Sequence, residues 1–208
     1  MKSIHQKLKG FISIEIALVL IISAIIGFAL IQQQARAAKK EVAKIQADQL
    51  IQLADAVNSY SDLYRRGLVN PGDLEVDLGN DGTIDVIIPE SAPAGGIEGS
   101  KLTPTIGNLI AAGLLPPGFQ NTPAASNGLF ISRLRIEPAA TCTPANNDCR
   151  IEGYVTITQP VTTGNQNPAA GQFDGDVLGD TLGFLGGNGF ATLAAGQSAV
   201  SSGGNFTV

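Results

Sequence analysis

An unbroken apolar run follows the polar residues 1–10. From Phe11 to Ile31 there are 21 residues, and Glu15 is the only charged one. A helix rises about 1.5 Å per residue, so such a run spans about 31 Å, close to the thickness of the hydrocarbon core of a bilayer. The pattern therefore predicts a helix that can cross a membrane while carrying one carboxylate, which is rare and usually functional there.

Residues 35–66 continue the helical signal but are amphipathic. They are good helix formers without Gly or Pro. Their apolar side chains recur every three to five positions: Val42, Ile45, Leu50, Leu53, Val57, Tyr60 and Tyr64. We expect one helix from about Phe11 to about Arg66, whose second half needs a folded domain to cover its apolar stripe.

Residues 67–208 show turn and strand signals. The segment LEVDLGNDGTIDVII alternates on both sides of the turn at residues 80–82 and predicts a β-hairpin. In LTPTIGNLIAAGLLPPGF, Thr103 as N-cap, Pro104 at the first helical position and Gly113 at the end predict a short helix. The Gly-rich last third predicts a turn of helix and one or two strands.

Cys142 and Cys149 are separated by six residues and flanked by two strand patterns, LFISRLRIE and RIEGYVTIT. This arrangement favours a disulfide across a hairpin loop, and hence an oxidising compartment outside the cytoplasm. The alternative is two free thiols in a surface loop. The expected fold is α+β: a long N-terminal helix packed on a small antiparallel-sheet head with a disulfide hairpin.

Charge is unevenly distributed along the chain. From Gly67 to Val208 there are four basic and thirteen acidic residues, a net charge near −9. A nucleic-acid surface needs clustered Lys and Arg, so the acidic head is not expected to bind nucleic acid.

An enzymatic function is not expected. His5 is the only histidine, so a chain that begins after Gly10 has none and lacks Ser-His-Asp and Cys-His catalysis in their usual forms. The Gly-rich tail is not followed by the Lys-Ser/Thr of a phosphate-binding loop. Hydrolysis by paired carboxylates stays open, because the spacing of the acidic residues in space is not known from sequence.

Asp77, Asp81 and Asp85 form a weak candidate site for Ca²⁺, and no other cofactor is expected. Their spacing echoes an EF-hand loop, but Gly79 stands at one ligand position and Ile88 at the position of the bidentate Glu. A solvated hairpin turn is the alternative. A closed zinc site is not expected, because it needs four ligands and the chain has two cysteines.

A basic leader that ends in Gly10, followed by Phe11 and by Glu15 as the fifth residue after the leader, resembles the class III signal of type IV prepilins and type II secretion pseudopilins. The resemblance implies that a prepilin peptidase cuts between Gly10 and Phe11 and methylates the new amine. That amine is largely cationic near neutral pH. We expect Glu15 of one subunit to neutralise the Phe11 amine of the next during assembly, which would fix their register.

Two other interpretations of the N-terminus remain. One is a secretory signal peptide cleaved at the small-x-small site of residues 35–37, although the apolar core is longer than usual and the site lies in a strong helix former. The other is a plain signal anchor, in which Glu15 has no explanation.

The expected organisation is a leader (1–10), a transmembrane or filament-core helix (11–34), an amphipathic helix (35–66) and an acidic head (67–208). The expected function is a structural subunit of a type IV pilus, with other pilin subunits as partners. It would lie in the inner membrane with its head in the periplasm, and then in an extracellular pilus. A minor pilin is favoured, because NLIAAGLLPPGF and GDTLGFLGGNGF resemble, diffusely, the constant region of shufflon-type minor pilins of type IVb thin pili. The alternatives are a type II secretion pseudopilin and an exported adhesin or binding module with a conventional signal peptide.

Overall fold

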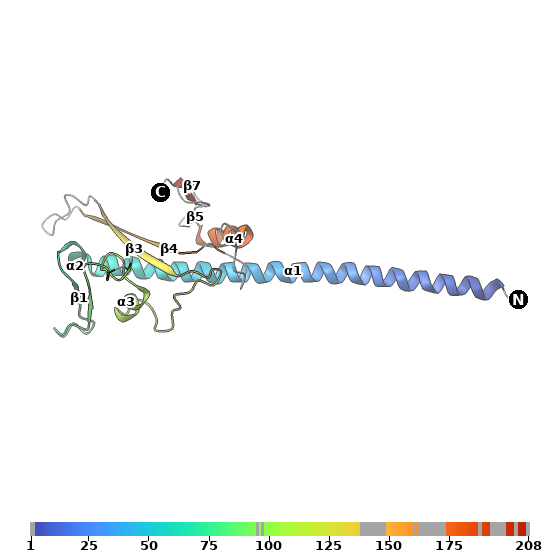
Figure 1. The fold of residues 1–208 in the computed structure, drawn as a ribbon, viewed down its shortest axis with the longest axis horizontal. Helices are drawn as coiled ribbons and strands as arrows, with labels where there is room; N and C mark the ends of the chain where they lie inside the picture. Colours follow the sequence, from blue (N-terminus) through green and yellow to red (C-terminus); the bar gives the residue numbers. More distant parts are fainter. Residues whose placement is uncertain are drawn as a thin grey trace. The chain divides into compact units, whose positions relative to one another are not determined.

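The computed structural model describes residues 3–94, 96, 98–137, 149–159, 161, 174–186, 189–191, 199–201 and 204–206, and side chains within 15–189. These residues form two compact units, Met1–Glu41 and Val42–Val208. Helix α1 (Ser3–Leu63) contributes to both units (Figure 1). The predicted helix is therefore present, and its backbone is already helical in the expected leader.

The second unit contains the other elements. Helices are α2 (Arg65–Val69), α3 (Ile106–Ala111) and α4 (Gly175–Leu185). Strands are β1 (Leu74–Val76), β2 (Val86–Ile88), β3 (Phe130–Glu137), β4 (Arg150–Ile157), β5 (Phe190–Ala191), β6 (Ala199–Ser201) and β7 (Gly204–Phe206). Among the described residues they form the antiparallel sheets β1–β2, β3–β4 and β5–β6–β7. The expected α+β class, a long helix packed on small antiparallel sheets, is confirmed.

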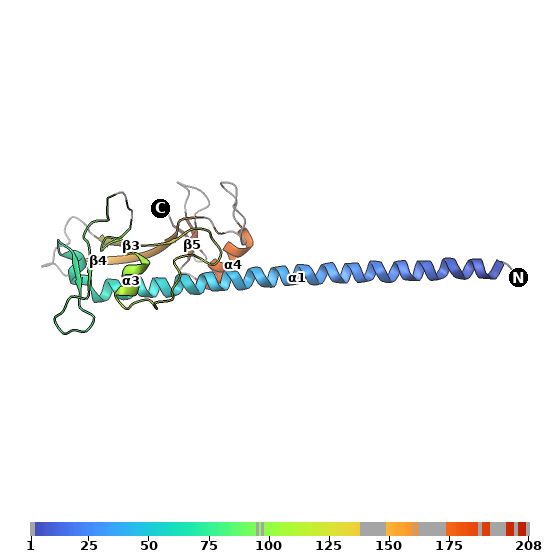
Figure 2. The ribbon, with the colours of Figure 1, turned by 60° about the horizontal axis from the view of Figure 1, so that its bottom comes forward.

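The core of this unit lies between α1 and the β3–β4 ribbon, which runs along the helix in both ribbon views (Figures 1 and 2). Leu53, Val57 and Tyr60 of α1 are at most 1% exposed and belong to one apolar cluster with Phe130 and Leu134 of β3. This confirms the central part of the predicted apolar stripe.

Ile45 departs from that stripe, since its side chain is 44% exposed. The covered positions at this end are Ala43 and Ala47, both fully buried, and Ala43 packs with Ala125 and Val177. Two alanines let the chain approach the helix closely, so a face that carries no large side chain became the packed one. The prediction for Ile45 was wrong.

The predicted hairpin and the two long strands are confirmed. Leu74 pairs with Ile88 in β1–β2, and Phe130 pairs with Ile157 in β3–β4. The loop between β1 and β2 uses left-handed backbone at Asn80 (φ 50°) and Gly82 (φ 86°), which explains the Asn-Asp-Gly sequence.

Three helix boundaries differ from prediction. The N-cap of α3 is Thr105, not Thr103, because Thr105 and Asn108 form a capping box while Thr103 bridges to Ser100. The first helix ends at Leu63 and a short helix follows, in which Gly67 leaves room for the Leu74 side chain. The last third contains an eleven-residue helix, α4, longer than the single turn expected.

Candidate assembly segment and the polar anchors of the head

The predicted cleavage and assembly residues all lie on α1. Gly10 and Phe11 are within its helical backbone, and the side chain of Phe11 is outside the described set. Glu15 is described and exposed. Glu15 follows Phe11 by four positions, so the two occupy the same helix face about one turn apart. The proposed pairing with another chain stays a prediction.

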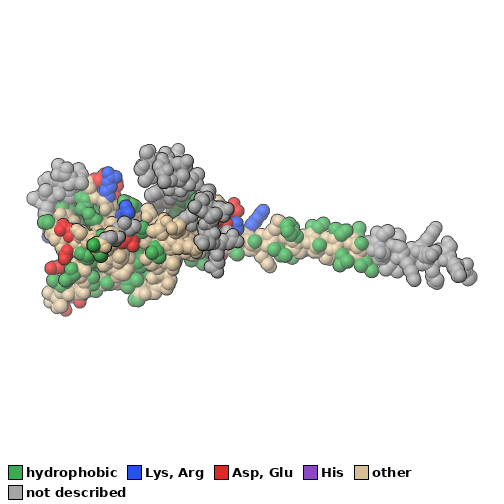
Figure 3. Space-filling model, viewed as in Figure 1, with side chains coloured by type: hydrophobic (Ala, Val, Ile, Leu, Met, Phe, Trp, Pro, Cys, Tyr) green, Lys and Arg blue, Asp and Glu red, His purple; other side chains and the backbone are tan. Residues whose placement is uncertain are grey.

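The apolar part of α1 has no covered face in its own unit. Eleven large hydrophobic side chains between Ile16 and Ile31 are 48 to 65% exposed, and Figure 3 shows them along the helix. They include the consecutive residues 18–22, which point in all directions around a helix. Within the described residues α1 is the one helix long and apolar enough to cross a membrane, a test that a signal sequence near an N-terminus also passes.

The carboxylates of the candidate calcium loop are used by the loop itself. Asp77 accepts hydrogen bonds from the backbone N–H of Asp81 (3.3 Å) and Gly82 (2.8 Å). Asp81 accepts one from Thr83 N at 2.8 Å, which lowers the pKa of its carboxyl group. Asp85 accepts one from Leu78 N at 2.7 Å. No three acidic, His or Cys side chains of the described residues are grouped as metal ligands. These contacts favour the solvated turn.

Cys149 is buried immediately before β4, and its carbonyl oxygen accepts a hydrogen bond from the Arg65 guanidinium. Cys142 lies outside the described residues. The disulfide between them stays a prediction, but the β3–β4 register, with Glu137 opposite Arg150, places both ends of the intervening loop together.

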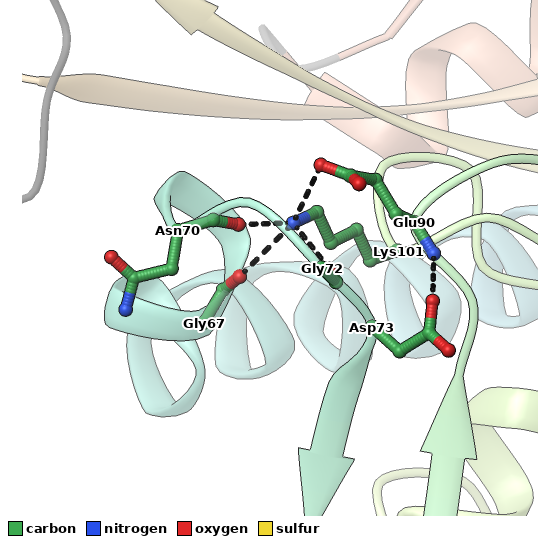
Figure 4. Close-up of polar contacts among 6 residues, drawn as sticks. All are labelled: Gly67, Asn70, Gly72, Asp73, Glu90 and Lys101. Atoms are coloured by element: carbon green, nitrogen blue, oxygen red, sulfur yellow. Dashed lines mark hydrogen bonds and ion pairs between the residues drawn. The ribbon is translucent and has the colours of Figure 1, made fainter.

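Lys101, to which no sequence pattern assigned a role, has a side chain that is only 4% exposed. Its ammonium group donates to the carbonyl oxygens of Asn70, Gly72 (2.8 Å) and Gly67 (3.4 Å), and lies 3.6 Å from a Glu90 carboxylate oxygen (Figure 4). It thereby gives donors to carbonyl groups at and beyond the end of α2, which have no helical partner of their own. One feature of the sequence could have drawn attention to this residue, because Lys101 is the only lysine in the acidic segment after residue 66.

The same network reaches α1 and β2. The Tyr60 hydroxyl donates to the Lys101 carbonyl oxygen at 3.2 Å, and the Glu90 N–H donates to Asp73 Oδ1 at 2.9 Å. Burial, with a smaller contribution from the nearby Tyr64, raises the pKa of Tyr60 well above its usual value. Lys101 therefore connects the end of α1 to α2 and to the residues that flank the first hairpin.

A second polar anchor lies at the other end of the head, where α1 enters it. Gln46 and Gln49 accept hydrogen bonds through Oε1 from the N–H groups of Ala125 and Ala124, each at 2.9 Å. Thr181 Oγ1 of α4 donates to the Val177 carbonyl oxygen at 2.7 Å and lies 3.4 Å from the Ala43 carbonyl oxygen of α1. From the sequence, glutamines at these positions of a helix are expected to face solvent. Their hydrogen-bond partners lie in a loop more than seventy residues later in the chain.

Taken by itself, the second unit is therefore a head fixed along α1 by an apolar core and by two polar anchors. No family model, curated protein or solved structure matches this chain.

Proposed function

We propose that this chain is a structural subunit of a type IV pilus, with a minor pilin favoured. It is cut after Gly10, methylated on the Phe11 amine and assembled through α1. One observation carries the proposal: the Gly10-Phe11-Glu15 spacing opens a helix that is apolar all round and that continues into a second half covered by a folded head.

The exposed apolar segment supports this function energetically. Eleven large apolar side chains about half exposed in the isolated chain are strongly unfavourable in water, at roughly 25 cal/mol per Å². A bilayer before assembly, and the apolar helices of other subunits after it, would each cover all faces of the segment. A binding module with a removed signal would need no such surface.

Glu15 has a role only in the assembled state. A carboxylate in the apolar segment is costly in the membrane unless it gains a partner. Cleavage at Gly10 creates a cation at Phe11, one turn away on the same helix face. In a filament of staggered subunits, Glu15 of one chain neutralises the amine of the next and selects their register.

The mass of the intact protein isolated from membranes tests this proposal. Loss of residues 1–10 with addition of one methyl group supports the pilin. A chain that begins at Ala38 supports an exported module with a conventional signal peptide. A chain that retains residues 1–10 contradicts both and indicates a signal anchor.

Gly10→Val tests the cut site itself. A branched side chain next to the scissile bond should block processing, so the uncut form accumulates in the membrane. Gly27→Ala is the matched control, because Gly27 also lies in α1 and has no atom within 4 Å of the added Cβ. Normal mature protein from Gly10→Val would exclude this cut site. Recovery of wild-type protein from sheared surface filaments separates a pilin from a secretion pseudopilin.

A further inference from the structure

A short polar stretch of α1, residues 32–41, follows the apolar segment of residues 11–31. Residues 32–38 are all exposed, Lys39 is half-buried, and residues 40 and 41 are exposed again. The first buried side chain among those described on α1 is that of Ala43. The polar stretch therefore extends for about 15 Å along the helix between the apolar segment and the part of α1 that carries the core.

The polar stretch is positively charged on one side. It contains Arg36, Lys39 and Lys40 against a single acidic residue, Glu41. The three basic residues lie within about 100° of one another around the helix axis, because each residue turns the helix by about 100°. Figure 3 shows basic side chains that project from α1 next to the apolar segment. Neither Arg36 nor Lys40 forms an ion pair with a described residue.

The distance from the apolar segment gives the depth of these charges in a bilayer. When residues 11–31 fill the hydrocarbon core, the polar headgroup layer extends about 5–8 Å beyond Ile31. Arg36 follows Ile31 by five positions, or about 7.5 Å, and Lys40 follows it by nine, or about 13.5 Å. Arg36 thus lies at the outer edge of the headgroup layer, and the long side chain of Lys40 can extend back toward it.

We propose that the basic side of α1 (Arg36, Lys39 and Lys40) binds the phosphate groups of anionic phospholipids, in the leaflet that the C-terminal end of the apolar segment reaches. The inference deepens the proposed function, because it rests on α1 crossing a membrane before assembly and names a lipid partner for that state. The Arg guanidinium pairs with phosphate through two parallel hydrogen bonds, and Lys adds a point charge. Basic residues next to an anionic bilayer surface each add to the attraction.

A second copy of the chain fits the same charges less well. Copies inserted in one bilayer hold residues 36–40 at the same depth, so their basic sides would repel each other if they met. A leaflet that contains anionic lipid supplies the opposite charge at the depth where it is needed. Lipid binding at this end of the apolar segment also opposes a shift of the helix toward the other surface, to which Glu15 is closer.

Electron paramagnetic resonance with spin-labelled lipids tests the proposal. The full chain is reconstituted in vesicles that mix phosphatidylcholine and phosphatidylglycerol. The fraction of label slowed by contact with the protein is measured for spin-labelled phosphatidylglycerol and for spin-labelled phosphatidylcholine, and the ratio of the two fractions gives the selectivity. The lysines of the leader are the same in every variant, so the comparison between variants removes their contribution.

Three double variants separate charge from other effects. Arg36→Gln with Lys40→Gln is the neutralised variant, and Arg36→Lys with Lys40→Arg keeps both charges. Arg135→Gln with Arg150→Gln is the matched control, because it removes the same charge from side chains of β3 and β4 that are 69% and 77% exposed.

Wild-type protein should select phosphatidylglycerol, and the neutralised variant should lower this selectivity at least about twofold. The variant that keeps both charges and the matched control should retain the wild-type selectivity. Raised sodium chloride should lower the selectivity of the wild type more than that of the neutralised variant. Sodium phosphate at the same ionic strength should have no larger effect than the chloride, because the partner is a lipid and not free phosphate.

A wild-type protein without selectivity for phosphatidylglycerol, or a neutralised variant with the wild-type selectivity, would overturn the inference. Loss of selectivity in phosphate but not in chloride would also overturn it, because the site would then take the free anion. Failure of the proposed function looks different. An N-terminus that stays uncut, or absence from filaments, leaves the lipid selectivity unchanged, whereas a mature chain that begins at Ala38 lacks Arg36 and refutes both.

Discussion

Gly153 of β4 lies directly against Val57 of α1, and a Cβ atom at Gly153 would come within 2.7 Å of Val57 Cγ1. The sheet approaches the helix this closely only because this strand residue has no side chain. The same built atom would lie 3.4 Å from Leu134 Cδ2 of β3, so the space is closed on two sides.

Gly153→Ala should therefore destabilise the head, with a free energy of unfolding lower by about 1–3 kcal/mol, the usual effect of overpacking a core. The free energy of unfolding is measured by urea unfolding in detergent, with resistance to trypsin as the readout. Gly179→Ala in α4 is the control: nothing lies within 4 Å of its added Cβ, and Ala favours helix, so stability should hold or rise. Equal losses in both variants would mean that the close approach at Val57 is unimportant.

Lys101→Met should cost more stability than any change to its carboxylate partner. The substitution leaves the carbonyl oxygens of Asn70 and Gly72 without their buried donor, which costs about 1–3 kcal/mol. Glu90→Gln should change stability by less than about 1 kcal/mol, because the Glu90 side chain is 50% exposed and the pair is screened. The losses of stability in the two variants are compared through their midpoints of thermal unfolding. A larger loss in Glu90→Gln would make the ion pair, and not the carbonyl oxygens, the main partner.

Tyr60 should make the head sensitive to alkali. Burial raises the pKa of Tyr60, whereas in the unfolded chain the phenol ionises near its usual value of about 10. Below about pH 10 the phenol is neutral in both states and its contribution to stability is complete. As the pH rises further the unfolded chain loses the proton and the folded one keeps it, so stability falls by up to about 1.4 kcal/mol per pH unit.

Tyr60→Phe should lower stability at neutral pH by about 1 kcal/mol, because the bond to the Lys101 carbonyl oxygen is lost, and should flatten the fall above about pH 10. Unfolding by urea at several pH values gives both effects. Tyr154→Phe, at a side chain of β4 that is 38% exposed, is the matched control and should change stability at neutral pH by less than about 0.5 kcal/mol. The idea fails if Tyr60→Phe and the wild type lose stability in parallel as the pH rises.

Glu15→Ala should leave cleavage and membrane insertion intact but reduce entry into filaments at least about tenfold. The variant inserts as readily as wild type because a charge leaves the apolar segment. In a filament the neighbour's Phe11 amine would stay unpaired in an apolar setting, which is strongly unfavourable. Sheared filaments are probed for the protein, with Glu41→Ala, another exposed acidic position of α1, as control. Mixed expression with wild type should raise incorporation of the variant. Wild-type amounts of Glu15→Ala alone would exclude this role.

Features that depend on neighbours along the chain could be predicted from the sequence. The apolar run, the continuous helix, the turn at Asn80 and Gly82, and the two long strands follow from local backbone preference and periodicity. The motif at Gly10, Phe11 and Glu15 is likewise a matter of spacing, and what it implies for assembly remains a proposal.

Which of the locally possible conformations and contacts is used depends on packing between distant parts of the chain. Ile45 belonged to the apolar stripe by periodicity, yet the loop containing Ala125 packs on Ala43, and Ile45 stays 44% exposed. Thr103 and Thr105 are both plausible N-caps, and the bridge to Ser100 removes the first. Lys101 is buried because carbonyl oxygens some thirty residues earlier in the chain converge on it. Burial depends on groups that are distant in sequence, and a local pattern carries no information about which of these groups pack against a given residue.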